Sequence, residues 1–252
     1  MSNPLITIVT ATTGREQLVR CVKSVKDQTY QNIEHIVVAD GPDATHRVYD
    51  LIDNAGMPDP THLIGLPKSV GKDRYNGHRI YGAGTFLMDG DYIIFLDDDN
   101  WLEPTHVENC LRACHLANPI YGFSWAFSFR NIVDRAGNFL CQDNCESLGK
   151  WPSIIHPQDY FVDVNCYFLP RNMAVAMAPV WFCKFREPGQ PEIDRKMMAF
   201  LRQHFPAYES TYKYSVNYTV GNTDLSVTPD FFVQGNAAML QRYNGNLPWV
   251  KK

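Results

Sequence analysis

The stretch that decides the fold is DYIIFLDDDN, residues 91–100. Its apolar run, 92–96, is rich in β-branched and aromatic residues, is too short for a helix, and is preceded by Gly90. Such a run predicts a buried strand, central in a parallel sheet. Asp97, Asp98 and Asp99 follow at once, and adjacent carboxylates repel one another unless a cation lies among them.

A divalent metal is the cation that this pattern indicates. Mg²⁺ and Mn²⁺ prefer hard oxygen ligands, and Mg²⁺ is typically held by one or two carboxylates together with substrate phosphates. In an open α/β sheet, ligands bind at the carboxyl ends of the strands, where these acids would lie. The alternative is an acidic turn that caps a helix beginning near Trp101, although a cap requires only one acid.

Composition narrows the class of protein. The 252 residues are 45% hydrophobic and 20% charged with a net charge of -4, which is typical of a globular chain of one large or two small domains. The absence of a basic block argues against nucleic acid as the main partner. The N-terminus has no positive region before its apolar run, and no run is long enough to span a bilayer, so we expect a cytoplasmic protein without a transmembrane segment.

The seven cysteines are an odd number without a secretion signal, which favours reduced thiols in the cytosol. A zinc site formed by Cys110, Cys114, Cys141 and Cys145 is one alternative. The first two also fall on one face of a predicted helix, where cysteine behaves as a small apolar residue.

Strands and helices alternate through the first half of the chain, which predicts a parallel βαβ sheet with right-handed crossovers. A capping box, 13-TGRE-16, is expected to open the first helix. The predicted strands are 5–10, 33–39, 62–66 and 92–96, and the predicted helical segments are about 14–25, 44–54 and part of 71–88.

The alternation weakens after Asn100. We expect helices over 104–116 and 191–204 and strands over 121–129 and 160–168. There is no linker, internal repeat or low-complexity segment. The simplest interpretation is one domain, 1–252, in which 1–104 binds a nucleotide and 105–252 shapes an acceptor site.

Two segments in the first half resemble the family 2 glycosyltransferases. ITIVTATTGREQLVRCVKSVKDQTYQNIEHIVVADG (6–41) is similar to the opening of that family, and GDYIIFLDDDNWLEP (90–104) is similar to its strand with a DxD motif. VDVNCYFLPRNMAVAM (162–177) and PEIDRKMMAFLRQHF (191–205) resemble, more loosely, its acceptor-side strand and the helix that carries its catalytic base.

The resemblance implies a GT-A fold, an α/β architecture whose Rossmann-like, mostly parallel central sheet is flanked by helices, with a smaller mixed acceptor-side region. It implies transfer of a sugar from a nucleotide-diphosphate donor, most often a UDP-sugar, to a hydroxyl of a carbohydrate or other acceptor, with inversion. Mn²⁺ or Mg²⁺ would stabilise the charge on the leaving diphosphate. Asp99 would be its main protein ligand, assisted by Asp97, while Asp97 and Asp98 would contact the ribose, metal waters or the sugar.

The remaining donor contacts are assigned from position. Asp40, which ends the second strand, would accept a hydrogen bond from the uracil N3–H, although an Asx turn into Gly41-Pro42 is the alternative. The other candidates are two threonines at the end of the first strand and three cations before the central strand that would meet the diphosphate: Thr10, Thr12, Lys72, Arg74 and Arg79.

Asp194 is the candidate general base, because the base of the resembled family falls at the start of the corresponding helix. Its place beside the apolar stripe of the helix predicts a side chain at the border between core and site. The alternative is an acid that interacts only with the helix dipole. Glu192, Asp163 and His156 are the other candidates for the base.

Other functional classes stay open. The chain could be an inactive GT-A-like protein that binds nucleotide-sugars, a sugar nucleotidyltransferase, or a metal-dependent phosphatase. A nucleotidyltransferase would have a glycine-rich opening, whereas only Gly14 interrupts this first turn. A phosphatase would normally carry a nucleophilic Asp-x-Asp on its first strand. The released product distinguishes them: nucleoside diphosphate, pyrophosphate or inorganic phosphate.

Overall fold

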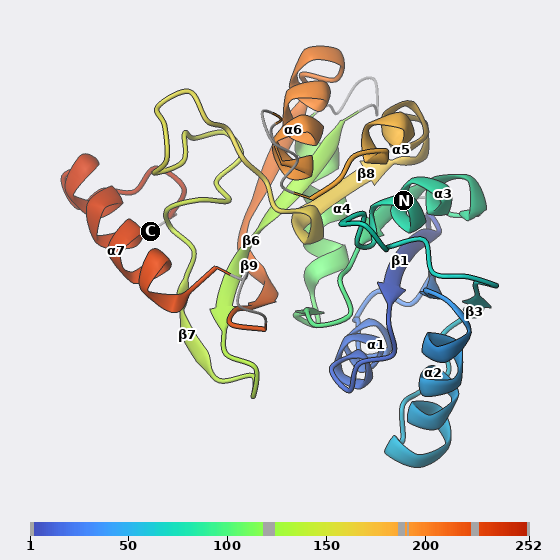
Figure 1. Ribbon diagram of the computed structural model, residues 1–252. Coiled ribbons are helices and arrows are strands. Elements are labelled where there is room, and N and C mark those ends of the chain that lie inside the picture. Colours follow the sequence, from blue (N-terminus) through green and yellow to red (C-terminus); the bar gives the residue numbers. More distant parts are fainter. Residues whose placement is uncertain (1–2, 118–123, 186–189, 191, 223–226, 251–252) are drawn as a thin grey trace.

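A computed structural model describes residues 3–117, 124–185, 190, 192–222 and 227–250. The described strands form a curled sheet in the order β3-β2-β1-β4-β8-β6-β9-β5, with β7 paired to β6 (Figure 1). The strands are β1 (Ile6–Thr12), β2 (Ile33–Ala39), β3 (His62–Gly65), β4 (Tyr92–Phe95), β5 (Trp101–Leu102), β6 (Trp125–Val133), β7 (Phe139–Gln142), β8 (Tyr167–Pro170) and β9 (Tyr208–Thr219). The α-helices are α1 (Leu18–Lys26), α2 (Pro42–Ala55), α3 (His78–Leu87), α4 (His106–Ala117), α5 (Arg171–Met177), α6 (Ile193–His204) and α7 (Pro229–Arg242).

The first half has the predicted βαβ order. β1 pairs in parallel with β2 on one side and with β4 on the other, and β2 pairs in parallel with β3. On α1, Leu18, Cys21, Val22 and Val25 recur at helical spacing and are buried, so one face of this helix packs on the core. This half therefore has the doubly wound pattern, in which parallel strands present their carboxyl ends at one edge.

β4 is central in the sheet, as predicted, and the sheet changes direction beside it. Ile93, Ile94, Phe95 and Leu96 are completely buried. One neighbour, β1, is parallel, and the other, β8, is antiparallel. The acids that follow β4 therefore lie between the parallel nucleotide-type half and the mixed second half.

The second half is built on the long pair β6 and β9, which run in parallel with two register shifts. β8 pairs antiparallel with both β4 and β6 and so joins the two halves. Figure 1 shows α5 and α6 at one end of this region and α7 on its outer side. The fold is thus α/β with a mostly parallel sheet in its first half and a smaller mixed region in its second.

Two local predictions are wrong. The capping box at 13–16 does not form, because Gly14 adopts a positive φ of 77°, the chain turns, and α1 begins only at Leu18 without a side-chain cap. The strand expected over 160–168 is confined to Tyr167–Pro170, because Asp163 instead caps a 3₁₀ turn, η1 (Val164–Cys166). The first three residues of the strand expected over 121–129 lie outside the described residues, and β6 begins at Trp125.

Candidate active site

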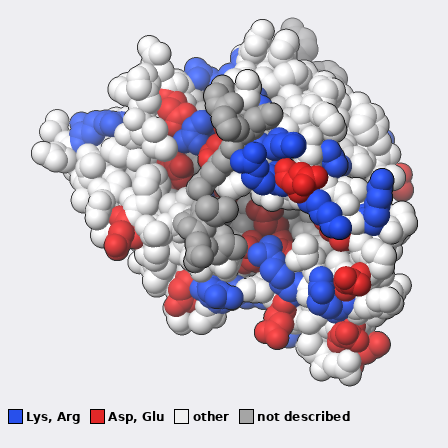
Figure 2. Space-filling view, viewed as in Figure 1, with Lys and Arg blue, Asp and Glu red and all other residues white. Residues whose placement is uncertain are grey.

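The acidic triplet follows the end of β4 and lies beside the last residues of β1. Thr12, the last residue of β1, donates from Oγ1 to Asp98 Oδ2 over 2.6 Å. Asp98 is buried, whereas Asp99 keeps part of its side chain exposed. Acidic side chains are visible in a hollow of the face shown in Figure 2, with Lys and Arg side chains around its rim. This arrangement puts carboxylates at the edge where a doubly wound sheet binds ligands.

Arg15 is the cation among these carboxylates. Its guanidinium forms an ion pair with Asp98 through Nη2, donates to the same carboxylate through Nε (3.3 Å), and donates to Asp99 Oδ2 through Nη1 (3.1 Å). The pKa of Arg15 is raised, because attraction to Asp98 and Asp99 outweighs the effect of burial, which lowers it. The repulsion expected of adjacent acids is therefore partly relieved by a residue of the chain itself.

Asp99 has the clearest electrostatic abnormality of the triplet. Burial raises its pKa from 3.8 to about 7, Arg15 lowers it, and the charges of Asp97 and Asp98 raise it. Asn222 donates to its Oδ2 over 2.7 Å, so both Asn222 and Arg15 contact one oxygen. Asp99 is thus a carboxylate that gains from a further positive charge nearby.

Asp97 is held from both sides. Tyr81 on α3 donates from its hydroxyl to Oδ1 (2.6 Å), and Asn165 donates from Nδ2 to Oδ2 (2.9 Å). Burial, followed by the charge of Asp97, raises the pKa of Tyr81 well above 10, so the phenol stays protonated and remains a donor. These contacts leave Asp97 less free than Asp99 to bind a metal.

Asp194 lies in the first turn of α6, on the acceptor side. Its Oδ1 is buried and has no hydrogen-bond partner among the described residues, although part of the residue is exposed. Burial raises its pKa well above 3.8, and the charges of Asp163 and Asp97 raise it further, whereas Arg130 lowers it. The charge of Asp97 thus acts on Asp194, which has an oxygen that can accept a proton.

The other candidates for the base already accept hydrogen bonds from neighbouring residues. Asp163 uses both oxygens, accepting from Arg130 Nη1 (2.6 Å) at Oδ2 and from Asn165 at Oδ1. Glu192 accepts from Arg195 (Nη1–Oε2 3.4 Å), and His156 is an exposed ring whose Nδ1 accepts from the backbone of Gln158. Of the four candidates, Asp194 is the one with a buried oxygen that no described residue contacts by a hydrogen bond.

Asp40 holds a loop in place. Its carboxylate accepts hydrogen bonds from Ser69 Oγ (2.9 Å), Val70 N (2.6 Å) and Gly71 N (3.0 Å). These bonds differ from the Asx turn considered above, because the donors come from the loop before α3. The predicted contact with uracil stays a prediction, and it would be made by a carboxylate that also fixes this loop.

The remaining donor-site candidates make contacts of their own, and their roles toward the diphosphate stay predictions. Thr10 contacts His35 Nε2 (3.0 Å) inside the sheet, away from Thr12 and its bond to Asp98. Lys72 and Arg74 are exposed on the loop that Asp40 fixes. The guanidinium of Arg79 lies 3.4 Å from the ring centre of Tyr75 and donates to Val70 O (3.3 Å).

The residues present fit a metal that is shared with a substrate. Within the described ranges, no group of three or more His, Cys, Asp or Glu side chains is arranged to hold a metal by itself. Asp99, with its raised pKa and incomplete neutralisation, suits the mode in which one or two carboxylates and substrate phosphates hold Mg²⁺ or Mn²⁺. The zinc alternative has no support within those ranges, and six of the seven free thiols are buried.

Sequence reasoning missed three residues that shape the site. Arg15 follows β1 directly and was available as a nearby cation, but it was assigned to a capping box. Tyr81 and Asn165 come from an apolar helix and a predicted strand, where their polar groups carried no pattern that distinguished them. Only the pairing of α3, β4 and η1 shows that both contact Asp97.

Comparisons with known proteins identify the family. The profile described as "Glycosyl transferase family 2" matches residues 7–134, half of the chain. The chain belongs to this family.

Named relatives agree with this assignment. "Putative glycosyltransferase EpsH" of Bacillus subtilis is 29% identical over 118 residues, which are 44% of this chain and 31% of that protein. "Putative colanic acid biosynthesis glycosyl transferase WcaA" of Escherichia coli is 25% identical over 187 residues, 74% of this chain and 60% of that protein. The chain thus aligns with about a third to three fifths of these two proteins.

Solved structures of TarS from S. aureus share the fold. The structure of TarS 1-349 in complex with UDP has a TM-score of 0.59 and 11% identity, covering 96% of this chain and 72% of that one. A second structure contains UDP-GlcNAc, with a TM-score of 0.59 over 94% of this chain and 66% of that one. In the part of the chain that the structure describes, no helix is long and apolar enough to cross a membrane.

Proposed function

We propose that the chain transfers a sugar from a nucleotide-diphosphate donor, most simply a UDP-sugar, to an acceptor hydroxyl with inversion at the anomeric carbon. The observation that carries this proposal is the buried Oδ1 of Asp194, which has no hydrogen-bond partner in the part of the chain that the structure describes and belongs to a carboxylate whose pKa is raised by burial and by the charges of Asp163 and Asp97. Family membership and the UDP and UDP-GlcNAc bound to the TarS structures support a nucleotide-sugar as donor.

Asp99, assisted by Asp97, would hold Mn²⁺ or Mg²⁺ against the diphosphate. The metal, when bound, supplies positive charge for the leaving nucleoside diphosphate. Arg15 supplies a second positive charge at the same edge, because its guanidinium already lies against Asp98 and Asp99. Together these charges favour the departure of the diphosphate.

Asp194 would act as the general base. The acceptor oxygen forms its bond to the anomeric carbon while its proton moves to Asp194 Oδ1, and the bond to the diphosphate breaks with its electron pair on the phosphate oxygen. The raised pKa makes this carboxylate a stronger base than an exposed aspartate, and Arg130 favours its ionised form. Attack from the face opposite the leaving group gives inversion.

The test begins with products. The purified protein, incubated with Mn²⁺ and a panel of nucleotide-sugars, should be stabilised against heat by one donor and should release nucleoside diphosphate from it. Turnover that persists in excess EDTA would refute the metal requirement. Release of pyrophosphate would indicate a nucleotidyltransferase, release of phosphate a phosphatase, and donor binding without turnover against an acceptor panel an inactive binding protein.

Asp194→Asn tests the base. The substitution should lower kcat by about 10²–10⁴-fold, the usual contribution of a general base, while donor affinity changes little. Glu192→Gln is the matched control, because it removes an acid at the N-cap of the same helix. A normal kcat in Asp194→Asn, with a collapse in Glu192→Gln or Asp163→Asn, would assign the base to another residue.

A further inference from the structure

Asn165 lies at the junction of the two halves. It is the middle residue of η1, directly before β8, and it is buried. β8 pairs with both β4 and β6, so η1 leads into the strand that joins the donor side to the acceptor side. The amide of Asn165 is therefore placed between carboxylates that belong to different halves.

The side chain of Asn165 makes three hydrogen bonds to its neighbours. Its Nδ2 donates to Asp97 Oδ2 (2.9 Å) and to Asp163 Oδ1 (2.8 Å), and its Oδ1 accepts from the backbone N–H of Asp97 (2.6 Å). Its backbone N–H donates to Asp163 Oδ1 as well (3.0 Å). Every polar atom of the amide is used, and two carboxylates are fixed by one group.

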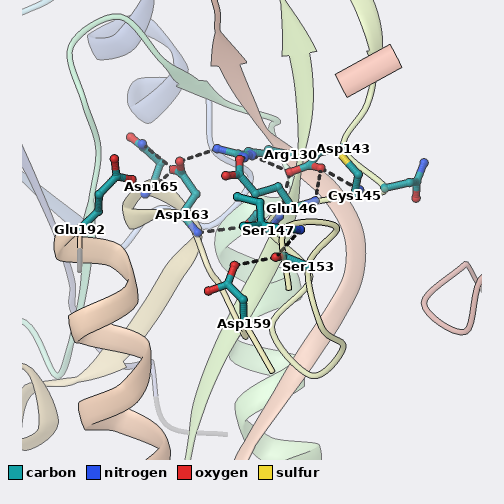
Figure 3. Close-up of polar contacts among 12 residues, drawn as sticks. Arg130, Asp143, Cys145, Glu146, Ser147, Ser153, Asp159, Asp163, Asn165 and Glu192 are labelled. Atoms are coloured by element: carbon teal, nitrogen blue, oxygen red, sulfur yellow. Dashed lines mark hydrogen bonds and ion pairs between the residues drawn. The ribbon is translucent and has the colours of Figure 1, made fainter. Parts of the chain in front are cut away.

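Asp163 is fixed in turn by a second cluster. The guanidinium of Arg130, on β6, donates to Asp163 Oδ2 (2.6 Å), Asp143 Oδ2 (2.8 Å) and Glu146 Oε2 (2.5 Å). Figure 3 shows these side chains converging, with Asn165 beside Asp163. All four charged groups are buried, so a change of rotamer would leave a charge unpaired and is strongly opposed.

Only an amide satisfies this position. Both neighbouring carboxylates are acceptors when ionised, so the bridging group must donate two hydrogens from one atom and also accept from the N–H of Asp97. A carboxylate would add a further charge, and a hydroxyl has one hydrogen to donate. The chemistry of the site thus selects asparagine for reasons beyond its volume.

We propose that Asn165 is a positioning residue that fixes Asp97 against Asp163, so that the Arg130 cluster of the acceptor side determines where the donor-side carboxylate lies. The inference rests on the proposed function, in which Asp97 contacts the nucleotide-sugar or its metal. In this proposal Asn165 acts through Asp97, with which it shares two hydrogen bonds.

A double-mutant cycle on donor affinity tests the chain of contacts. UDP with Mn²⁺ is the probe, and its affinity is measured by calorimetry for wild type, Asn165→Ala, Asp163→Asn and the double variant. Each single substitution should weaken UDP binding about tenfold or more, because each removes hydrogen bonds to the charged groups that fix Asp97. The double variant should bind UDP no more weakly than the worse single variant, because both substitutions interrupt the same series of hydrogen bonds to Asp97.

Asn131→Ala is the matched control. Asn131 is a partly buried amide on β6 that donates to Tyr214 O and to Asn217 Oδ1, both over 3.2 Å, and so contacts uncharged acceptors. Its loss should leave UDP affinity unchanged. Equal losses in Asn131→Ala and Asn165→Ala, or additive losses in the cycle, would show that Asn165 only packs the junction and would overturn the inference.

A structural measurement keeps the inference separate from the proposed function. If wild type does not bind UDP with Mn²⁺, the nucleotide assignment fails, whereas the position of Asp97 can still be determined. Crystal structures of wild type and Asn165→Ala should show the Asp97 carboxylate turned away from Asp163 in the variant. An unchanged Asp97 would refute the inference. Asp163→Asn, which preserves volume, serves the same purpose if Asn165→Ala does not fold.

Discussion

Asp99→Asn is expected to stabilise the free protein at alkaline pH while removing its response to metal. The pKa of Asp99 in the folded chain is about 7, raised from 3.8 chiefly by burial. Because the folded pKa lies above the unfolded one, the folded state binds more protons between these values. The contribution of Asp99 to the free energy of unfolding therefore falls as pH rises from about 4 to about 7.

The size of the effect follows from the two pKa values. At about 1.4 kcal/mol per pH unit, the raised pKa of Asp99 lowers the free energy of unfolding of the wild type, relative to a side chain that is always neutral. This loss is at most about 4 kcal/mol at pH 8 and about 2 kcal/mol at pH 5. An asparagine side chain is neutral at both pH values. Arg15 and Asn222 both donate to Oδ2, so an amide oxygen in that place keeps both contacts. Asp99→Asn should thus be more stable than wild type, by more at pH 8 than at pH 5.

Urea unfolding in EDTA at pH 5 and pH 8 measures this difference. Asp134→Asn is the control of opposite sign, because hydrogen bonds from Asn138 lower the pKa of that partly exposed carboxylate and its ionised form is stabilising. At pH 8, Mn²⁺ with UDP should raise the Tm of wild type and leave that of Asp99→Asn unchanged. An Asp99→Asn variant that is less stable than wild type at pH 8 would refute the electrostatic reasoning.

Two further substitutions address the cation and the loop. Arg15→Met should destabilise the free protein at pH 8 by roughly 1–3 kcal/mol, less than for a fully buried pair because the side chain is 41% exposed. Mn²⁺ should add more stability to Arg15→Met than to wild type, which unfolding measured with and without Mn²⁺ would determine. Equal gains in the two proteins would contradict this expectation. Asp40→Ala should cost about 1–3 kcal/mol, because loop donors lose their acceptor. It should also weaken UDP binding in calorimetry, and equal UDP affinities would remove Asp40 from the donor site.

The order of the first half could be predicted from the sequence because local signals there agree with the fold. Apolar runs such as 92–96 are buried strands, and helical spacing on α1 corresponds to a buried face. The acid triplet was found for the same reason, since its charge density is a local property. The parallel pairing of β1, β2 and β4 then places these segments at one sheet edge without further information.

The partners of the acids could not be predicted, because they arise from contacts distant in sequence. Arg15 meets Asp98 across 83 residues, and Asn165 meets Asp97 across 68. The failed capping box has the same origin: residues 13–16 have suitable types, but Gly14 turns the chain and Arg15 pairs with Asp98. Local propensity is a weak effect beside the neutralisation of a buried carboxylate.

The two arginines suggest how one chain keeps so many acids near one site. Arg15 neutralises part of the donor-side triplet, and Arg130 neutralises part of the acceptor-side cluster. A third cation between them would attract Asp97 and Asp194 and compete with both substrate and metal. A neutral amide at 165 instead joins the two clusters by hydrogen bonds and adds no charge. Burial, and after it the remaining negative charge, raises the pKa of Asp99 and of Asp194, the two carboxylates whose proposed roles need a cation or a proton.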